Sequence, residues 1–333
     1  MRATDLVEVE GARWEELVHR LGVEDLYYSR GFVAASAGLV DGTPVLLHLA
    51  APDGDVVFPC LLREDPRDVV TPYGYGGPLG VGPDPPLAAF AAAYAGWCAR
   101  RSVITTFVVY HPLFANQRHA AQTGLRPAAL AGTVAWPLAG PDLLEGMHKH
   151  HRRLVRRARA QGLVATVDRS PADLSAFVAL YEDTMRRAGA APFYLFATSY
   201  WDALLRDVAL VRVDVRDAEG RLLAGVLGAG APPWLHYHLG GATDAGRGTG
   251  ASHLALYALA CHGRENGYAA LHLGGGVGGR ADSLLEFKRR FAPGVLLDAH
   301  VGKAVHDPAA YAELTGTERI DWQGFFPAYR ALG

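Results

Sequence analysis

Short hydrophobic runs bounded by glycine and proline predict the strands of this chain. The first two, over 43–51 and 55–63, are separated by Pro52-Asp53-Gly54, which is typical of a hairpin turn. The remaining predicted strands cover 103–110, 208–216, 222–230, 234–240, 268–273 and 295–301. None of these runs reaches the length of a membrane-spanning helix, so we expect no stable membrane insertion.

Longer segments with apolar residues at helical spacing predict helices over 30–40, 87–101, 141–161 and 252–266. Gly162 follows the third of these at the position of a C-terminal cap. The segment 71–83 is too rich in glycine and proline for regular structure and is predicted to be a loop. Each half of the chain therefore runs hairpin, glycine-rich loop, helix and strand, and this repetition predicts two copies of one α/β unit.

Length, charge and cysteine content limit the kinds of protein that this chain can be. The 333 residues suit two domains, and half of them are hydrophobic, enough for a sizeable core. The net charge of −2 provides no global basic field that would attract DNA. Three cysteines, far apart and odd in number, argue against a disulfide framework and for a reducing compartment. The N-terminus lacks a signal-peptide core, and we therefore expect a cytoplasmic protein.

The stretch 271–291 concentrates the candidate chemistry. Five glycines in the six positions 274–279 let backbone N–H groups approach a ligand closely, because no Cβ blocks the approach. A short predicted helix follows, on which Phe287 and Phe291 share one face while Lys288 points elsewhere, toward a cleft. The chain has only 3 lysines, which makes Lys288 a candidate functional cation.

A second glycine loop, residues 247–252, follows a predicted strand and opens a predicted helix. Backbone N–H groups at a helix N-terminus, together with the helix dipole, bind anions such as phosphate. Acyl-CoA N-acyltransferases of the GNAT superfamily hold pyrophosphate on a similar motif, R-G-x-G-x-G/A, and a tight turn capped by serine is the competing interpretation. The candidate donor-binding residues are Arg247, Gly248, Gly250 and Ser252.

Other nucleotide and hydrolytic chemistries have weaker support. Gly274, Gly276 and Gly279 fit the fingerprint of dinucleotide-binding folds, with Asp298 beyond them, but the intervening helix is short for that crossover. No Walker lysine follows the glycines, which excludes a P-loop. No G-x-S-x-G nucleophile turn is present, which disfavours a hydrolase.

The helix predicted over 141–161 carries a dense run of basic residues. Arg152 and Arg156 lie one turn apart, as do Arg153 and Arg157, which gives two adjacent ridges. The ridges are either a solvated helix face or a surface that contacts the phosphates of a nucleotide or an RNA.

Two histidines, His236 and His238, alternate along one predicted strand and are expected on the same face, with His272 on a neighbouring strand. No Cys/His spacing signature accompanies them, so we predict a polar patch in a substrate channel and no metal site. Either histidine, or the substrate itself, is a candidate proton acceptor.

In three places the chain resembles the FemABX family of tRNA-dependent aminoacyltransferases, which add amino acids to peptidoglycan precursors. Residues 152–163 are similar to the family's R-x-x-[IV]-[RK]-[RK]-A-x-x-x-G helix, and 271–276 to its (Y/D)-x-(F/L)-G-G turn. Residues 287–291 are similar to its F-K-x-x-F motif, and the loop 71–80 looks like a loop of the first domain in relatives.

The resemblance implies an α/β fold of two tandem GNAT-like domains with mixed central sheets. The first domain, on the acceptor side, is expected to comprise 1–145 with about 303–333, and the second, on the donor side, 146–302. The C-terminal tail is then expected to pack on the first domain through its aromatic residues, Trp322, Phe325, Phe326 and Tyr329.

The resemblance also assigns roles to residues. Lys288 is expected to stabilise the oxyanion as an amine attacks the aminoacyl ester, with Phe287 beside it. The residues expected to contact tRNA are Arg152, Arg153, Arg156 and Arg157. The resemblance assigns no acceptor-binding residues in the first domain, and the candidates taken from this sequence itself are Tyr73, Tyr75, His236, His238, Gly275 and Asp282.

The expected reaction is therefore transfer of an aminoacyl group from aminoacyl-tRNA, as a co-substrate and with no cofactor, to an amine. The acceptor is a small molecule, a peptide or a peptidoglycan precursor, in cell-wall or antibiotic biosynthesis. Two alternatives stay open: an acyl-CoA-dependent GNAT N-acyltransferase, and a non-catalytic binding protein on the same fold.

Overall fold

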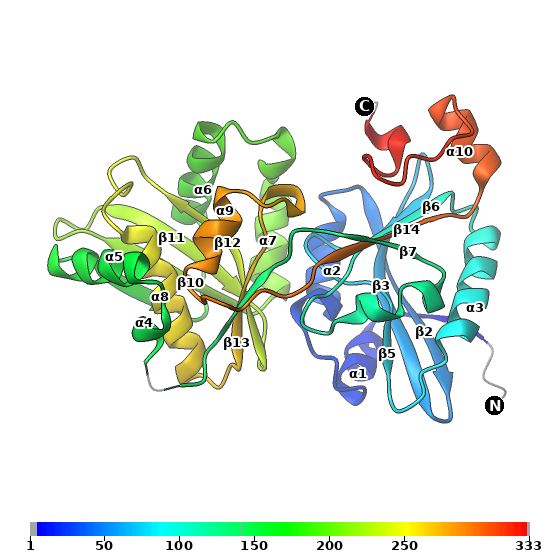
Figure 1. The fold of residues 1–333 in the computed structure, drawn as a ribbon, viewed down its shortest axis with the longest axis horizontal. Helices are drawn as coiled ribbons and strands as arrows, with labels where there is room; N and C mark the ends of the chain where they lie inside the picture. The colour runs from blue at the N-terminus through cyan, green and yellow to red at the C-terminus, as the bar shows by residue number, and fades with distance from the viewer. Residues whose placement is uncertain (1–4, 141, 332–333) are drawn as a thin grey trace. The chain divides into compact units, whose positions relative to one another are not determined.

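Two separate β-sheets, one in each of two units, form the framework of the chain (Figure 1). The computed structural model describes residues 5–140 and 142–331. The first unit comprises Met1–Leu130 with Asp298–Gly333, and the second comprises Ala131–Leu297.

The first unit is built on a mixed sheet with strand order β1-β2-β3-β4-β6-β14-β7, and β5 lies beside β3. The hairpin predicted at 43–51 and 55–63 forms, with ten residue pairs from Gly42↔Arg63 to Ala51↔Gly54. The strands are β1 (Val7–Val9), β2 (Gly42–Ala51), β3 (Gly54–Arg63), β4 (Asp68–Val70), β5 (Leu79–Val81), β6 (Thr105–Val109), β7 (Arg126–Ala129) and β14 (His300–Val305).

One long helix covers a face of this sheet. It presents buried Phe90, Tyr94 and Trp97 to the sheet, because these side chains recur at three- and four-residue spacing. The opposite face packs on a shorter helix that begins after Ser29, whose side chain caps it. The helices of this unit are α1 (Ala12–Arg20), α2 (Arg30–Ala37), α3 (Leu87–Arg100) and α10 (Pro308–Thr315).

The second unit has a six-stranded mixed sheet with order β8-β13-β12-β11-β10-β9. Its strands are β8 (Val134–Pro137), β9 (Val164–Asp168), β10 (Leu210–Arg216), β11 (Leu222–Ala229), β12 (Trp234–Ala242) and β13 (Ala270–Gly274). Its helices are α4 (Leu143–Gly146), α5 (Lys149–Ala160), α6 (Ser175–Arg187), α7 (Thr198–Asp207), α8 (Ala251–Glu265) and α9 (Ser283–Arg289).

Helices cover both faces of the second sheet (Figure 1). A Cβ on Gly225 of β11 would lie 3.2 Å from side-chain atoms of Leu180 and Phe177 in α6. A Cβ on Gly228 would lie 2.9 Å from Leu259 in α8. Since these glycines are three apart on one strand, they point to opposite faces, and α6 and α8 therefore lie on opposite sides of the sheet.

Both units follow one plan, as the sequence predicts. In each, antiparallel strands are followed by a helix, and the helix leads into a strand that pairs in parallel with one of them. These parallel pairs are β4 with β6, connected through α3, and β12 with β13, connected through α8. A parallel pair needs such a crossover connection, and a helix supplies it.

The unit boundaries differ from the expected ones at 145/146 and 302/303. Residues 131–145 belong to the second unit because β8 pairs with β13 in its sheet. The C-terminal segment from Asp298 belongs to the first unit, where β14 pairs with both β6 and β7. The tail beyond it is fixed by a hydrogen bond of 2.6 Å between the hydroxyls of Tyr329 and Thr105, although Phe325 is 64% exposed.

The helix predicted over 141–161 is wrong, because α4 and α5 are separate helices. Asp142 caps α4 by accepting the N–H of Leu144 at 2.8 Å, while Pro141 lies outside the described residues. Met147 and His148 are extended, and Met147 is buried. Two further predictions were too coarse: the loop 71–83 contains β5, and the strand expected at 295–301 begins at His300.

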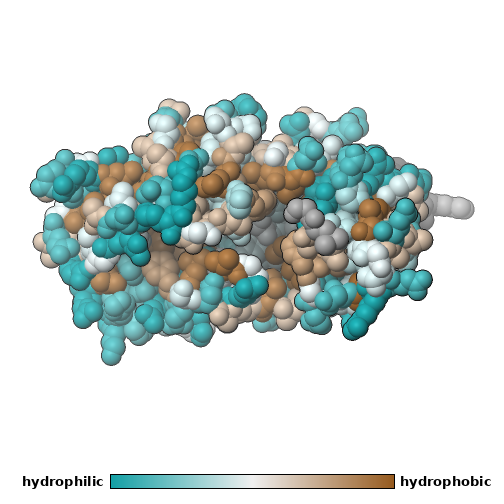
Figure 2. Space-filling view, turned by 90° about the horizontal axis from the view of Figure 1, so that it is seen from above, coloured by the Kyte–Doolittle hydropathy of each residue, from teal (hydrophilic) through white to brown (hydrophobic). Residues whose placement is uncertain are grey.

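Hydrophilic side chains interrupt the hydrophobic areas on the face shown in Figure 2. Among the described residues, no helix is both long enough and apolar enough to span a membrane.

Candidate functional site

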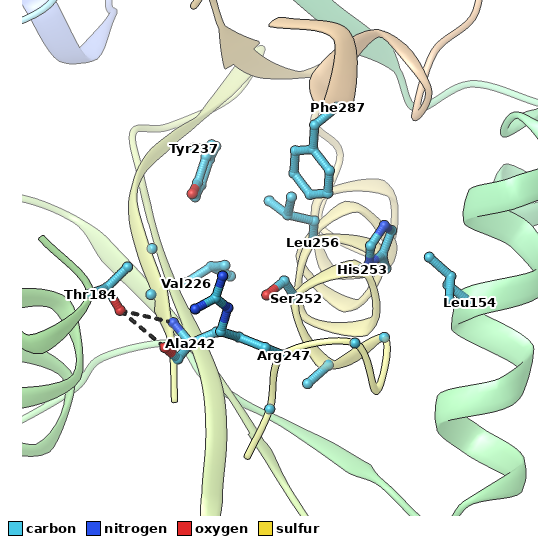
Figure 3. Close-up of a pocket in the computed structure, with 17 residues that line it drawn as sticks. Leu154, Thr184, Val226, Tyr237, Ala242, Arg247, Ser252, His253, Leu256 and Phe287 are labelled. Carbon is cyan, nitrogen blue, oxygen red and sulfur yellow. Dashed lines mark hydrogen bonds between the residues drawn. The ribbon is translucent and has the colours of Figure 1, made fainter. Parts of the chain in front are cut away.

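A cavity of about 370 Å³ opens in the second unit beside β12, the N-terminus of α8, and side chains of α5 and α9 (Figure 3). All four predicted donor-binding residues line it, and Phe287 of α9 lines it as well. The fold thus brings two separate sequence predictions, the glycine loop and the F-K-x-x-F segment, to one cavity.

The loop between β12 and α8 has a backbone that requires glycine. Gly250 has φ of 92°, and a Cβ there would lie 2.5 Å from the carbonyl oxygen of Leu154. The hydroxyl of Thr249 donates to the carbonyl of Gly246 at 2.7 Å and accepts the N–H of Ala251 at 3.2 Å. These contacts fix the loop, so it presents its amide groups in a set geometry.

The start of α8 offers positive potential to this cavity. Within the described part of the chain, the N–H groups of Ser252 and His253 have no intramolecular acceptor, as expected for the first turn of a helix. The guanidinium of Arg247 projects into the space between Ala242 and Ser252 in Figure 3. Its side chain is 70% exposed, and its contact with Asp244 is a long 3.6 Å. The loop therefore suits a phosphate group.

The other end of the cavity is aromatic (Figure 3). Burial raises the pKa of Tyr237 to about 12, so its hydroxyl stays protonated at neutral pH. Burial, and secondarily the nearby His151, lowers the pKa of His253 to about 3. A base this weak is poorly matched to abstract a proton at neutral pH.

Lys288 is buried behind this aromatic end and is not itself on the cavity wall. Its Nζ donates to the carbonyl of Gly275 at 2.7 Å and lies 5.7 Å from the centre of the Tyr237 ring. Burial lowers the pKa of Lys288 to about 8, and the charge of Asp282 partly opposes this shift. The ammonium is therefore held in place and remains mainly protonated at neutral pH.

Gly275 and Asp282, predicted to bind the acceptor, hold the turn around Lys288. The carboxylate of Asp282 accepts the N–H groups of Val277 and Leu285, each at 2.8 Å. The bond from Leu285 caps the N-terminus of α9, and the bond from Val277 closes the glycine turn that precedes it. In this structure the carbonyl of Gly275 and the carboxylate of Asp282 accept hydrogen bonds from other groups of the protein.

His236 and His238 lie away from this cavity. The two Nδ1 atoms of His236 and His272 are 3.3 Å apart, and Nε2 of His238 is 2.7 Å from the hydroxyl of Tyr200. Burial lowers the pKa of His238 to about 3. Tyr237, between the two histidines, lines the cavity instead. The other predicted acceptor residues, Tyr73 and Tyr75, belong to the first unit.

The two basic ridges on α5 differ in their partners. Arg152 and Arg156 both form ion pairs with Glu145, Arg152 at 3.0 Å. Arg153 and Arg157 are exposed and form no ion pair among the described residues. None of the four lines the cavity. The second ridge is thus the one whose charge is available to a phosphate.

Sequence reasoning missed Tyr237, His253 and Thr184, which all line the cavity. For Tyr237 the signal was present, because it alternates with the two histidines and must face the other side of β12. For Thr184, on α6, no motif gave a signal. Its hydroxyl accepts the N–H of Ala242 at 3.1 Å and so ties α6 to the end of β12.

Comparisons with known proteins agree with this architecture. Residues 146–289 match the family model described as an acetyltransferase (GNAT) domain. No curated protein matches the sequence. Among solved structures, FemX has a TM-score of 0.65 at 14% identity, covering 94% of this chain and 100% of that one.

Two further structures share the fold. One is the C-terminal domain of a putative lysylphosphatidylglycerol synthetase from Agrobacterium fabrum, with 17% identity, a TM-score of 0.58 and coverage of 91% and 94%. The other is a tandem GNAT protein from the clavulanic acid biosynthesis pathway, with 13% identity, a TM-score of 0.55 and coverage of 92% and 99%. The predicted fold, two tandem GNAT-like domains as in FemX, is confirmed.

Proposed function

We propose that this protein is an acyltransferase that forms an amide bond in its second unit, and that its donor is an aminoacyl-tRNA. The observation that carries the proposal is Lys288, an ammonium kept buried and fixed beside the aromatic end of the cavity. A fixed cation at the place where negative charge develops stabilises the transition state of acyl transfer.

The chemical step is attack of an amine on the carbonyl carbon of the aminoacyl ester. A C–N bond forms, the carbonyl oxygen takes negative charge, and the bond to the ribose oxygen then breaks. The proton lost by the amine passes to that departing oxygen. Lys288 has three N–H donors and uses one on Gly275, so two remain for the oxyanion. Because neither His253 nor His238 is a suitable base, the substrate is the better proton acceptor.

The donor's phosphates have two candidate sites in the same unit. The loop 247–252 supplies N–H groups and Arg247 at the cavity. The exposed ridge of Arg153 and Arg157 supplies charge on α5, the helix whose Leu154 lines that cavity. A polynucleotide is long enough to use both, which favours tRNA as the donor. The fold shared with FemX supports the same choice.

A second candidate, an acyl-CoA-dependent N-acyltransferase, is favoured by a different observation. The loop 247–252 lies on the wall of the cavity that contains Phe287, so a donor with a pyrophosphate and a short arm fits without using α5. The match of residues 146–289 to an acetyltransferase domain supports this candidate too.

A donor assay separates the two candidates. Purified protein is incubated with a pool of charged tRNAs, or with acetyl-CoA, in a cell extract, and RNase is added to half of the samples. RNase-sensitive amide formation supports the tRNA donor, whereas RNase-insensitive product that needs acetyl-CoA supports the second candidate. The absence of amide product with either donor would contradict both, and would favour a binding protein on this fold.

A further inference from the structure

His151 of α5 holds the turn of α9 that carries Lys288. Its Nε2 lies 2.9 Å from the carbonyl oxygen of Phe287, and because that oxygen only accepts, Nε2 must carry the proton. The last carbonyls of a helix lack intrahelical donors, and His151 supplies one here. The N–H of His148 also donates to the carbonyl of Arg290, at 2.9 Å. The start of α5 therefore clamps the end of α9.

Packing alone does not account for a histidine at this position. The ring is 2% exposed and lies among aromatic rings, with centroids 4.4 Å from His253, 4.6 Å from Phe291 and 5.2 Å from Phe287. Its Nδ1 is buried and has no hydrogen-bond partner among the described residues. A phenylalanine would fill the same aromatic site without leaving a buried nitrogen unpaired. What the histidine adds is the single hydrogen bond to Phe287.

That hydrogen bond acts one residue before Lys288. The Nζ of Lys288 donates to the carbonyl of Gly275 and lies beside the ring of Tyr237. This placement depends on the orientation of the α9 turn. We propose that His151 is a positioning residue, which keeps the Lys288 ammonium directed at the reacting carbonyl by fixing the carbonyl of Phe287. This inference rests on the acyl transfer proposed above.

Three variants test the role. His151→Phe keeps the aromatic packing and removes the donor, and His151→Gln places an amide N–H near the position of Nε2. His262→Phe is the matched control, because His262 is also buried in this unit but bonds to Asn266, the C-cap residue of its own helix. We expect His151→Phe to lower kcat roughly 10- to 100-fold, since a misplaced catalytic group costs that much, with KM for the donor nearly unchanged. His151→Gln should recover most of the loss, and His262→Phe should keep wild-type kcat.

A second readout is independent of turnover. The chain has only 3 lysines, so the reaction of each with acetic anhydride can be followed by peptide mass spectrometry as a function of pH. In His151→Phe, Lys288 should gain access to water, and its pKa should move from about 8 toward its ordinary 10.5. The same measurement on His262→Phe should give the wild-type value.

These experiments distinguish failure of the His151 role from failure of the proposed acyl transfer. Wild-type kcat in His151→Phe, or equal loss in His151→Phe and His262→Phe with no change in Lys288 labelling, would overturn the positioning role alone. If Lys288→Met keeps full activity, the proposed role of Lys288 fails instead. The labelling result then still reports whether His151 holds the lysine.

Discussion

Replacing Lys288 by methionine separates catalysis from stability. Methionine keeps an unbranched apolar stem beside the Tyr237 ring and removes the ammonium. A fixed cation at a developing oxyanion is worth roughly 3 kcal/mol, which corresponds to roughly 100- to 200-fold in turnover. We therefore expect kcat to fall by about two orders of magnitude, while donor affinity is retained because the loop 247–252 is untouched.

The same variant should be no less stable than the wild type. Burial lowers the pKa of Lys288 from 10.5 to about 8. At about 1.4 kcal/mol per pKa unit, holding the charge in the folded protein costs on the order of 3 kcal/mol at neutral pH. Methionine removes this cost but leaves the carbonyl of Gly275 without its donor, which costs about 1–3 kcal/mol. The two changes offset each other.

Titration of Lys288 should change both the stability of the folded protein and its turnover with pH. Between pH 8 and 10.5 the unfolded chain keeps the proton on Lys288 and the folded protein does not, so stability from this group rises with pH in that window. Turnover should move the other way and fall as pH rises through about 8, because the oxyanion loses its cation. Steady-state kinetics and urea unfolding, on wild type and Lys288→Met, measure both. Unchanged turnover in the variant, or a variant that unfolds far more readily at neutral pH, would refute the reasoning.

Three further predictions follow from the donor site. Arg247→Glu should weaken acyl-CoA or tRNA binding by at least about tenfold, as a like charge meets the phosphate, measured by titration calorimetry. Arg153→Gln and Arg157→Gln should each lower the salt dependence of tRNA binding by about one phosphate contact, whereas Arg156→Gln, whose partner is Glu145, should have a smaller effect. Calorimetry of the intact chain should give one donor molecule bound per chain.

Each of these has a control within the same unit. Arg169→Gln removes an exposed arginine that lines neither the cavity nor the α5 ridge, and it should bind donor as the wild type does. Equal affinity of Arg247→Glu and wild type would remove the loop from the donor site. If all the arginine variants showed the same salt dependence of tRNA binding, the distinction between the ion-paired ridge and the exposed ridge of α5 would be wrong. Two donors per chain would contradict the single site.

Local patterns were sufficient where local chemistry decides the structure. The hairpin of β2 and β3 was predictable because Pro52-Asp53-Gly54 is a turn by itself and the flanking runs are apolar. The loop at 247–252 and the helix that follows it were predictable because the glycines and the helical pattern after them are visible in the sequence. Both predictions depend on neighbours within a few residues along the chain.

Tertiary contacts decided the elements that the sequence could not predict. The basic run at 149–160 continues a helical pattern back to residue 143, yet the chain extends at His148, whose N–H bonds to Arg290 far along the sequence. The burial of Lys288 likewise depends on Tyr237 and on the carbonyl of Gly275, neither of which is on its helix. The exposed or paired state of the arginines on α5 depends on Glu145, which a single long helix would have placed differently.

The two units differ in what surrounds the helix that follows their antiparallel strands. In the second unit, glycines precede α8, and free amide groups face the cavity. In the first unit, the corresponding helix α3 is preceded by Pro83, Pro85 and Pro86, which have no N–H to offer. The N–H of Leu87 is already bonded to the carbonyl of Pro85 at 2.8 Å. In both helices the N–H groups of the second and third residues, Ser252 and His253 in α8 and Ala88 and Ala89 in α3, have no intramolecular acceptor within the described residues. The helix dipole is also the same in both, so α8 is distinguished by its surroundings: Arg247 and the cavity that the loop before it lines.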